Sequence, residues 1–100
     1  MTKNFSEKVL ELCRRVPRGR VTTYKDIASA MGSKAYRAVG NALHKNNKPV
    51  KIPCHRVIRS DGKVGGYAGG IRKKMRLLKN EGVEIKDERV KDFRSKHVKV

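Results

Sequence analysis

The sequence places Cys54 beside His55, one of only two cysteines next to one of only three histidines. A thiol is a strong nucleophile only as the thiolate, and an adjacent imidazole together with the charge of Arg56 favours that form. Pro53 has a fixed φ directly before Cys54, which favours a single orientation of the Cys54 side chain over a mobile one. The alternative is a buried structural cysteine at the start of a short strand, Val57-Ile58.

The charge of the chain indicates the class of its partner. One hundred residues are enough for one small domain. Its formal net charge of +17 indicates that the partner is a polyanion. Nucleic acid is the first candidate and an anionic membrane surface the second. The sequence contains no transmembrane run, signal peptide or lipidation signal, so we expect an intracellular protein, cytoplasmic or, in a eukaryote, nuclear. Two cysteines in such a chain are expected to be free thiols.

The positive charge is concentrated around the cysteine. No acidic residue lies between Asp26 and Asp61, or again between Asp61 and Glu81, whereas both spans are rich in lysine and arginine. A merely solvated lysine-rich surface is the plain alternative. Because the acid-free stretch includes Cys54, we predict a surface that faces a polyanion.

The N-terminal segment has the apolar spacing of a helix that packs on a core. Ser6 is its expected N-cap, just before Glu7. Cys13 lies on the apolar stripe, so a core role is predicted for this second cysteine. The residues at helical spacing are Phe5, Val9, Leu12, Cys13 and Val16.

Two short helices follow, over residues 24–31 and roughly 34–44. Thr23 can cap the first, and Gly32-Ser33 separates the two. This pattern is typical of a helix-turn-helix, although a plain pair of helices has the same signal. Small side chains on the second helix permit close approach to a groove. Its polar and basic residues are Lys34, Arg37, Asn41 and His44.

The segment around and after Cys54 predicts a loop, a hairpin and a last helix. A turn is expected at 46–49, then a β-hairpin over 56–64 with an Asp61-Gly62 turn. The glycine-rich segment 65–70 encloses Tyr67 and predicts a binding loop. A helix over 71–80 then ends before Gly82, which suits the left-handed C′ position.

The predicted fold is mostly α-helical with a small β-hairpin, a winged-helix-like helix-turn-helix domain. We expect residues 1–85 to form the catalytic and DNA-binding domain and residues 86–100 a charged C-terminal tail. Residues 83–100 alternate charges without a period, so they are predicted to be weakly ordered or loosely docked.

The motifs together resemble a known family. Residues 53–57, Pro-Cys-His-Arg-Val, are similar to the active-site signature of the O6-alkylguanine-DNA alkyltransferases, which repair DNA and are consumed in doing so. The resemblance covers roughly Phe5 to Ile85. Further segments at family-like positions are Val21–Ala28 before and in the helix-turn-helix, Arg37–Gly40 in its second helix, Asn46, the loop Gly66–Gly70 and the closing Leu77–Gly82.

The resemblance implies a role for each residue of the candidate site. Cys54 would accept the alkyl group from guanine O6 and keep it as a thioether, without any cofactor or metal. His55 would take the thiol proton through a water, and Glu81 would orient the imidazole. Asn46 would organise the active-site turn, and Tyr24 would donate a hydrogen bond to the departing guanine.

The resemblance also implies the mode of DNA binding. The partner would be double-stranded DNA containing O6-alkylguanine, bound by a monomer through the minor groove, with O4-alkylthymine as a further substrate. Arg37 would occupy the place of the flipped nucleotide. The other implied DNA contacts are Tyr24, Lys34, Ala35 and Asn41, and the implied pocket residues are Tyr67, Val57, Ala68 and Gly69.

The sequence departs from the family pattern at several points. Family members usually carry an N-terminal domain, whereas this sequence begins almost at the catalytic domain. Ala68 stands where a serine is frequent, and the connection at 32–34 is short. The segment after Glu84 has no assigned counterpart.

Three other function classes each explain only part of the sequence. A non-enzymatic basic helix-turn-helix binder would explain the charge but not the Cys54, His55 and Glu81 combination. A thiol hydrolase would turn over repeatedly rather than stop after one burst. A metal site would need ligand pairs at regular spacing, which the cysteines and histidines lack: Cys13, Cys54, His44, His55 and His97.

Overall fold

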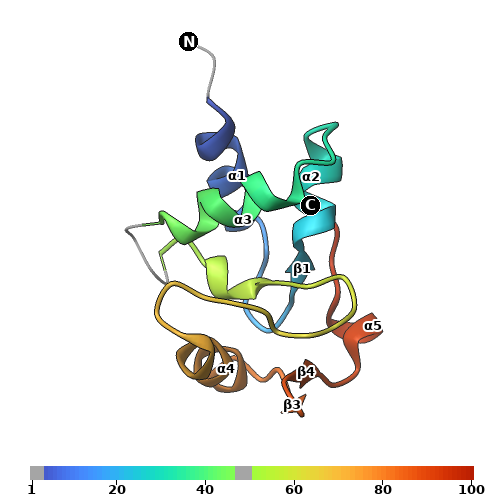
Figure 1. Cartoon of the computed structure of the whole chain (residues 1–100). Helices are drawn as coiled ribbons and strands as arrows, with labels where there is room; N and C mark the ends of the chain where they lie inside the picture. The colour runs from blue at the N-terminus through green and yellow to red at the C-terminus, as the bar shows by residue number, and fades with distance from the viewer. Residues whose placement is uncertain (1–3, 47–50) are drawn as a thin grey trace.

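The computed structural model describes residues 4–46 and 51–100, and within them the chain is mostly helical (Figure 1). The predicted helix-turn-helix fold is confirmed, and the turn expected at 46–49 lies largely outside the described residues. The helices are α1 (Phe5–Arg14), α2 (Tyr24–Ala30), α3 (Tyr36–His44), the 3₁₀ turn η1 (Cys54–Arg56), α4 (Ile71–Asn80) and α5 (Phe93–Lys96). The strands are β1 (Thr22–Thr23), β2 (Val57–Ile58), β3 (Ile85–Lys86) and β4 (Arg89–Val90).

Helix α1 begins as its apolar stripe predicts, but its cap differs from the expectation. Asn4, not Ser6, is the N-cap, and its Oδ1 accepts a hydrogen bond from the Glu7 backbone N at 2.8 Å. Ser6 already lies inside the first helical turn, so its backbone cannot take the extended conformation of a cap. Val9 and Cys13 of this helix are fully buried.

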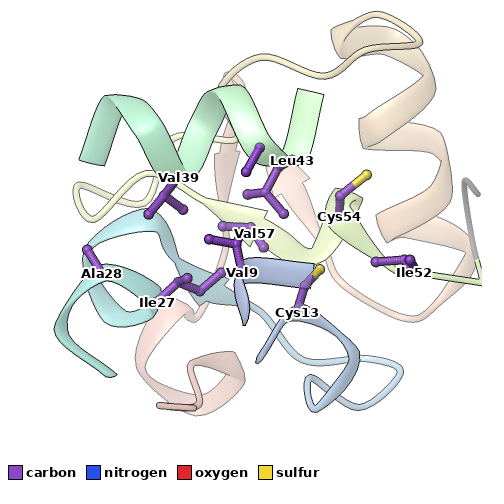
Figure 2. Packing of buried hydrophobic residues seen from close by; sticks show 10 residues of the cluster. Val9, Cys13, Ile27, Ala28, Val39, Leu43, Ile52, Cys54 and Val57 are labelled. Carbon is purple, nitrogen blue, oxygen red and sulfur yellow. The ribbon is translucent and has the colours of Figure 1, made fainter. Parts of the chain in front are cut away.

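The helix-turn-helix forms as predicted, with one change at its turn. Thr23 caps α2, and Thr23 and Asp26 form a reciprocal capping box. Gly32 takes φ +66°, which ends the first helix at little cost. Helix α3 begins at Tyr36, so Lys34 lies in the turn. Figure 2 shows Ile27 and Ala28 of α2 and Val39 and Leu43 of α3 within the main core.

The predicted hairpin over 56–64 is wrong in its pairing. Strand β2 instead pairs in parallel with β1, with Thr22 opposite Val57 and Thr23 opposite Ile58. The turn itself exists, because the Arg59 N donates to the Lys63 O at 2.9 Å and Gly62 takes φ +90°. The residues after the turn pair instead with the β4 segment, through the Lys63–Arg89 bridge and a hydrogen bond from the Val64 N to the Glu88 O at 2.8 Å.

The expectation of a weakly ordered segment over 83–100 is also wrong. Strands β3 and β4 form an antiparallel hairpin, and its two turn residues, Asp87 and Glu88, have φ of 53° and 60°. Val90 is buried in a second core cluster with Val21, and Phe93 packs against that cluster. Apolar residues such as Val90 and Phe93 therefore dock residues 83–100 on the second core cluster, although they are spaced too widely to show a helical or strand period. The functional division at residue 85 stays a prediction.

Candidate active site

The Cys54 thiol lies on a turn that holds it at the edge of the main core. The Cys54 N donates to the Ile52 O at 2.8 Å, and the Arg56 N donates to the Pro53 O at 2.9 Å. Asn46 reaches across from the end of α3, and its Nδ2 donates to the Ile52 O at 2.9 Å and to the Cys54 Sγ at 3.3 Å. Only 7% of Cys54 is exposed, so the thiol faces a limited opening rather than bulk solvent.

His55 is fully buried and bound to the carboxylate predicted for it. Its Nε2 lies 3.1 Å from Glu81 Oε2, and since a carboxylate only accepts, Nε2 carries the proton and Nδ1 the lone pair. That Nδ1 is buried without a hydrogen-bond partner among the described residues. Burial lowers the pKa of His55 below its usual value, and Glu81 offsets this only in part. The imidazole is therefore neutral near pH 7 and able to accept a proton.

Glu81 is shared between His55 and Arg56. The Arg56 Nε donates to Glu81 Oε1 at 2.9 Å and its second amino nitrogen donates to Oε2 at 2.7 Å, a bidentate pair. Burial alone would raise the pKa of Glu81, but the hydrogen bonds from Arg56 and His55 outweigh it and lower the pKa. The carboxylate is thus charged and fixed in place.

The end of α4 explains why a residue 26 positions after His55 reaches it. Gly82 takes φ +89° as predicted, and the Gly82 N donates to the Lys79 O while the Val83 N donates to the Leu78 O, both at 3.0 Å. This is the Schellman arrangement, in which the buried Val83 and Leu78 also belong to one core cluster. The helix end is therefore anchored, and Glu81 at its C-cap points inward.

A small cavity adjoins the thiol. Its volume is about 20 Å³, room for about one water molecule. The cavity lies between the helix-turn-helix, the active-site turn and the glycine-rich loop. The residues that line it are Tyr24, Gly40, Leu43, His44, Cys54, Gly66, Tyr67 and Ala68.

Lys74 is a functional candidate that the sequence analysis missed. It is fully buried, and its Nζ donates to the Gly66 O at 3.1 Å and to the Tyr24 hydroxyl at 3.4 Å. Burial lowers the pKa of Lys74 to about 7. Burial and the nearby charge of Cys54 raise the pKa of Tyr24. A signal was present, because Lys74 falls between Ile71 and Leu78 on the apolar face of α4.

Tyr67 and the glycine loop form one wall beside the thiol. The Tyr67 hydroxyl is buried without a hydrogen-bond partner among the described residues. Gly70 takes φ +97° and its N donates to the Tyr67 O at 2.9 Å, which bends the loop back into α4. A Cβ on Gly69 would lie 3.1 Å from the Tyr67 ring, so a larger residue there would push the ring.

The residues that line this cavity include neither Val57 nor Gly69, two of the predicted pocket residues. Val57 is fully buried in β2 and belongs to the main core. Gly69 lies against the Tyr67 ring. Cys13 is fully buried, as predicted, and desolvation raises the pKa of its thiol to about 12.

The predicted DNA-contacting residues lie on or just before α3, except Tyr24, which begins α2. Arg37 and Asn41 are exposed one helical turn apart, and Lys34 and Ala35 are exposed in the preceding turn. Arg37 has no carboxylate partner among residues 4–46 and 51–100. Tyr36 beside it is 43% exposed, which sequence reasoning had not singled out.

None of the helices in the described part of the chain is long and apolar enough to cross a membrane. Residues 4–46 and 51–100 contain no group of three or more His, Cys, Asp or Glu side chains that could hold a metal ion.

The fold and the site together define a helix-turn-helix domain built around a cysteine, a histidine and a glutamate. Residues 4–83 match the family model described as 6-O-methylguanine DNA methyltransferase, DNA binding domain. The chain belongs to this family.

Relatives and solved structures agree with the family assignment. The chain is 47% identical over 81 residues to the methylated-DNA–protein-cysteine methyltransferase of Methanothermobacter thermautotrophicus. The aligned residues are 81% of this chain and 46% of the relative. It is similar to the O6-methylguanine-DNA methyltransferase of Pyrococcus kodakaraensis strain KOD1, with TM-score 0.73 and 46% identity over 82% of this chain and 48% of that one.

A second solved structure is similar over its whole length. S. pombe Atl1, in complex with damaged DNA containing O6-carboxymethylguanine, matches with TM-score 0.84 and 30% identity over 100% of both chains. By contrast, the chain spans about half the length of the methyltransferase relatives that it matches.

Proposed function

We propose that this chain repairs DNA by moving the alkyl group of O6-alkylguanine to its own Cys54, once per molecule. The observation that carries the proposal is a nearly buried thiol, hydrogen-bonded by Asn46, beside a neutral histidine that a charged Glu81 holds. The Cys54 thiolate attacks the alkyl carbon, the bond from that carbon to O6 breaks, and guanine leaves with the electron pair. The thioether product is stable, so one transfer consumes the protein.

Proton transfer explains the arrangement of His55. With Nε2–H donated to Glu81, the free lone pair on Nδ1 is the acceptor for the thiol proton, delivered through one water. The imidazolium that results is stabilised by the adjacent carboxylate. Glu81 therefore orients the ring before the transfer and balances its charge afterwards.

The opposite side of the cavity serves the leaving group. Tyr24 donates a hydrogen bond to the departing guanine, and Lys74 holds the Tyr24 hydroxyl and the Gly66 carbonyl in place. The flipped nucleotide binds at the open side of this cavity, where Tyr67 and Ala68 of the loop over 65–70 form the wall.

Helix α3 presents the groups for binding duplex DNA. Arg37 enters the stack in place of the flipped nucleotide, and Asn41, Lys34 and Ala35 contact the backbone and the minor groove. The exposed Tyr36 ring adds apolar contact beside Arg37. Phosphate contacts carry most of the affinity, so the protein binds with little sequence preference. It binds as a monomer. Its substrates are O6-alkylguanine and also O4-alkylthymine.

One experiment tests the proposal directly. The chain is incubated with a duplex containing a single O6-methylguanine, and its intact mass and peptide map are measured. We expect one methyl group per molecule, on Cys54, with no further turnover. Cys54→Ser should remove the mass gain and Cys13→Ala should retain it. Retained DNA binding with an unmodified wild-type protein would identify a non-enzymatic lesion binder instead.

A further inference from the structure

The C-terminal segment forms part of the scaffold beside the active site. The Val21 N donates to the Lys96 O at 2.9 Å, and the Val98 N donates to the Val21 O at 2.8 Å. Val21 and His97 therefore form a parallel bridge, immediately before β1. Figure 1 shows the chain after α5 running back along β1 toward α2.

This pairing encloses β1 on both edges. Backbone groups of successive residues in a strand point to opposite edges, and Thr22–Thr23 pair with Val57–Ile58 directly after the Cys54 turn. The same short strand is thus held by the C-terminal segment on one side and by the active-site turn on the other. A displacement of residues 96–98 would release one of these two edges.

The side chain of His97 reaches past β1 to the start of α2. Its Nε2 lies 2.5 Å from Asp26 Oδ2, and the two side chains are 23% and 16% exposed. The ring also stacks on Phe93, with centroids 4.9 Å apart, so its orientation is set from the opposite side. These two contacts fix His97 between α5 and α2.

The carboxylate that His97 contacts is the one that caps α2. Asp26 Oδ2 also accepts from the Thr23 N at 3.2 Å and from the Thr23 hydroxyl at 2.7 Å. Burial alone would raise the pKa of Asp26, but the hydrogen bonds from His97 and Thr23 lower it, so the cap is charged. Thr23 is the N-cap in this capping box, and the next residue is Tyr24, which lines the cavity.

We propose that His97 is a positioning residue for Tyr24: by holding the Asp26 carboxylate from the C-terminal segment, it fixes the first turn of α2 and hence the phenol that faces the reacting base. The consequence for the reaction rests on the proposed function. The consequence for the placement of Tyr24 does not, so the two can be tested apart.

A double-mutant cycle tests the link to the reaction. His97→Phe keeps the stacking on Phe93 but removes the donor to Asp26, and His97→Gln keeps a donor. We expect His97→Phe to slow the single-turnover transfer rate about threefold to tenfold, with substantial rescue in His97→Gln. In a Tyr24→Phe background, which is itself slower, His97→Phe should cost nothing further. Lys99→Ala, an exposed change in the same segment, is the matched control.

Equal slowing by His97→Phe in both backgrounds, or no slowing at all, would overturn the proposal. The placement of Tyr24 is read independently by NMR of ¹³C-labelled tyrosine, with the Tyr24 resonance assigned by Tyr24→Phe. His97→Phe should shift that resonance and His97→Gln should restore it, whether or not the wild type transfers an alkyl group. An unchanged Tyr24 resonance would also overturn the proposal, whereas an inactive wild type would overturn only the proposed function.

Discussion

Arg56 decides how Glu81 meets His55. The guanidinium takes both carboxylate oxygens, and its remaining nitrogen donates to the Val16 O at 2.8 Å. Because three hydrogen bonds fix the Arg56 guanidinium, its bidentate pair with Glu81 keeps the carboxylate oriented toward the imidazole. We expected the charge of Arg56 to favour the Cys54 thiolate, whereas its guanidinium is bound to Glu81, the carboxylate behind His55.

Glu81→Gln tests the charge behind His55. Loss of the carboxylate removes the partner that favours the imidazolium, so proton transfer from Cys54 becomes harder. We expect the single-turnover rate to fall about tenfold to a hundredfold, while DNA affinity stays nearly unchanged. The measurement is the transfer rate on one alkylated duplex as a function of pH, paired with a binding titration. Glu84→Gln, an exposed carboxylate three residues on, should leave both quantities unchanged.

A profile for Glu81→Gln that overlays the wild-type profile would remove Glu81 from the mechanism. It would leave Glu81 as the C-cap of α4, a position where a negative charge is otherwise unfavourable.

Lys74→Met tests the cost of the buried amine. The pKa of Lys74 is about 7 in the folded state against 10.5 when exposed, so the unfolded chain binds more protons between these values. Stability therefore rises with pH across that window in the wild type. Methionine fills a similar volume, so we expect Lys74→Met to gain about 1–3 kcal/mol at pH 7, to lose this pH dependence, and to slow transfer.

Urea unfolding of wild type and Lys74→Met between pH 7 and 10 measures the effect. Lys73→Met, an exposed neighbour on α4, is the control and should keep the wild-type slope. A stability difference between wild type and Lys74→Met that stays constant over this range would contradict a depressed Lys74 pKa.

At the scale of elements, α3 combines two surfaces with different tasks. Val39 and Leu43 pack into the core, whereas Arg37 and Asn41 face outward. Gly40 lines the cavity, and a Cβ there would meet nothing within 4 Å, so the helix leaves open space beside the thiol. The helix that we propose to bind DNA is thereby also one wall of the cavity beside Cys54.

Arg37→Ala separates base extrusion from chemistry. An inserted side chain matters only when a nucleotide leaves the stack, so transfer from alkylated duplex should slow about tenfold or more. Reaction with a free O6-alkylguanine base should be almost unaffected. Both rates are measured by single-turnover alkylation of Cys54, with Arg14→Ala on α1 as an exposed control. Equal slowing on the two substrates would mean that Arg37 acts at the chemical step.

At the scale of the whole molecule, a net charge of +17 favours DNA binding and disfavours a compact state. Two half-buried acids hold distant segments together, because Glu81 pairs with Arg56 and Asp26 is hydrogen-bonded by His97. Both carboxyls have a lowered pKa in the folded state. The unfolded chain therefore binds more protons in acid, and stability falls as pH drops below about 4.

Asp26→Asn should reveal this dependence. At pH 7 the variant should be less stable by about 1 kcal/mol, because a charged cap is lost. As pH falls through the lowered pKa, native Asp26 takes up a proton and the difference should narrow. Thermal unfolding between pH 7 and 3 measures it, with Asp87→Asn in the exposed turn between β3 and β4 as the control. A difference that stays constant with pH would exclude a charged Asp26 as the cause.

Local chemistry made a large part of the fold and site predictable. Helical spacing identified α1 to α4, Thr23 and Gly82 act as the expected helix ends, and the residues around Cys54 identified the family. The association of His55 with Glu81 was also predicted, from the resemblance rather than from the residues themselves. Each of these features depends on neighbours within a few positions or on a motif with fixed spacing.

Only the tertiary structure decided which distant segments meet. A two-residue strand such as β2 has no pattern that selects β1 over its own hairpin partner, and in the fold that partner pairs with Arg89 instead. The docking of His97 on Asp26, 71 positions apart, leaves no local period. Lys74 shows the same limit, because its hydrocarbon stem fits an apolar stripe while its amine needs partners from the Gly66 loop and α2. Long-range partners are chosen by the packing of the whole chain, which no window of sequence contains.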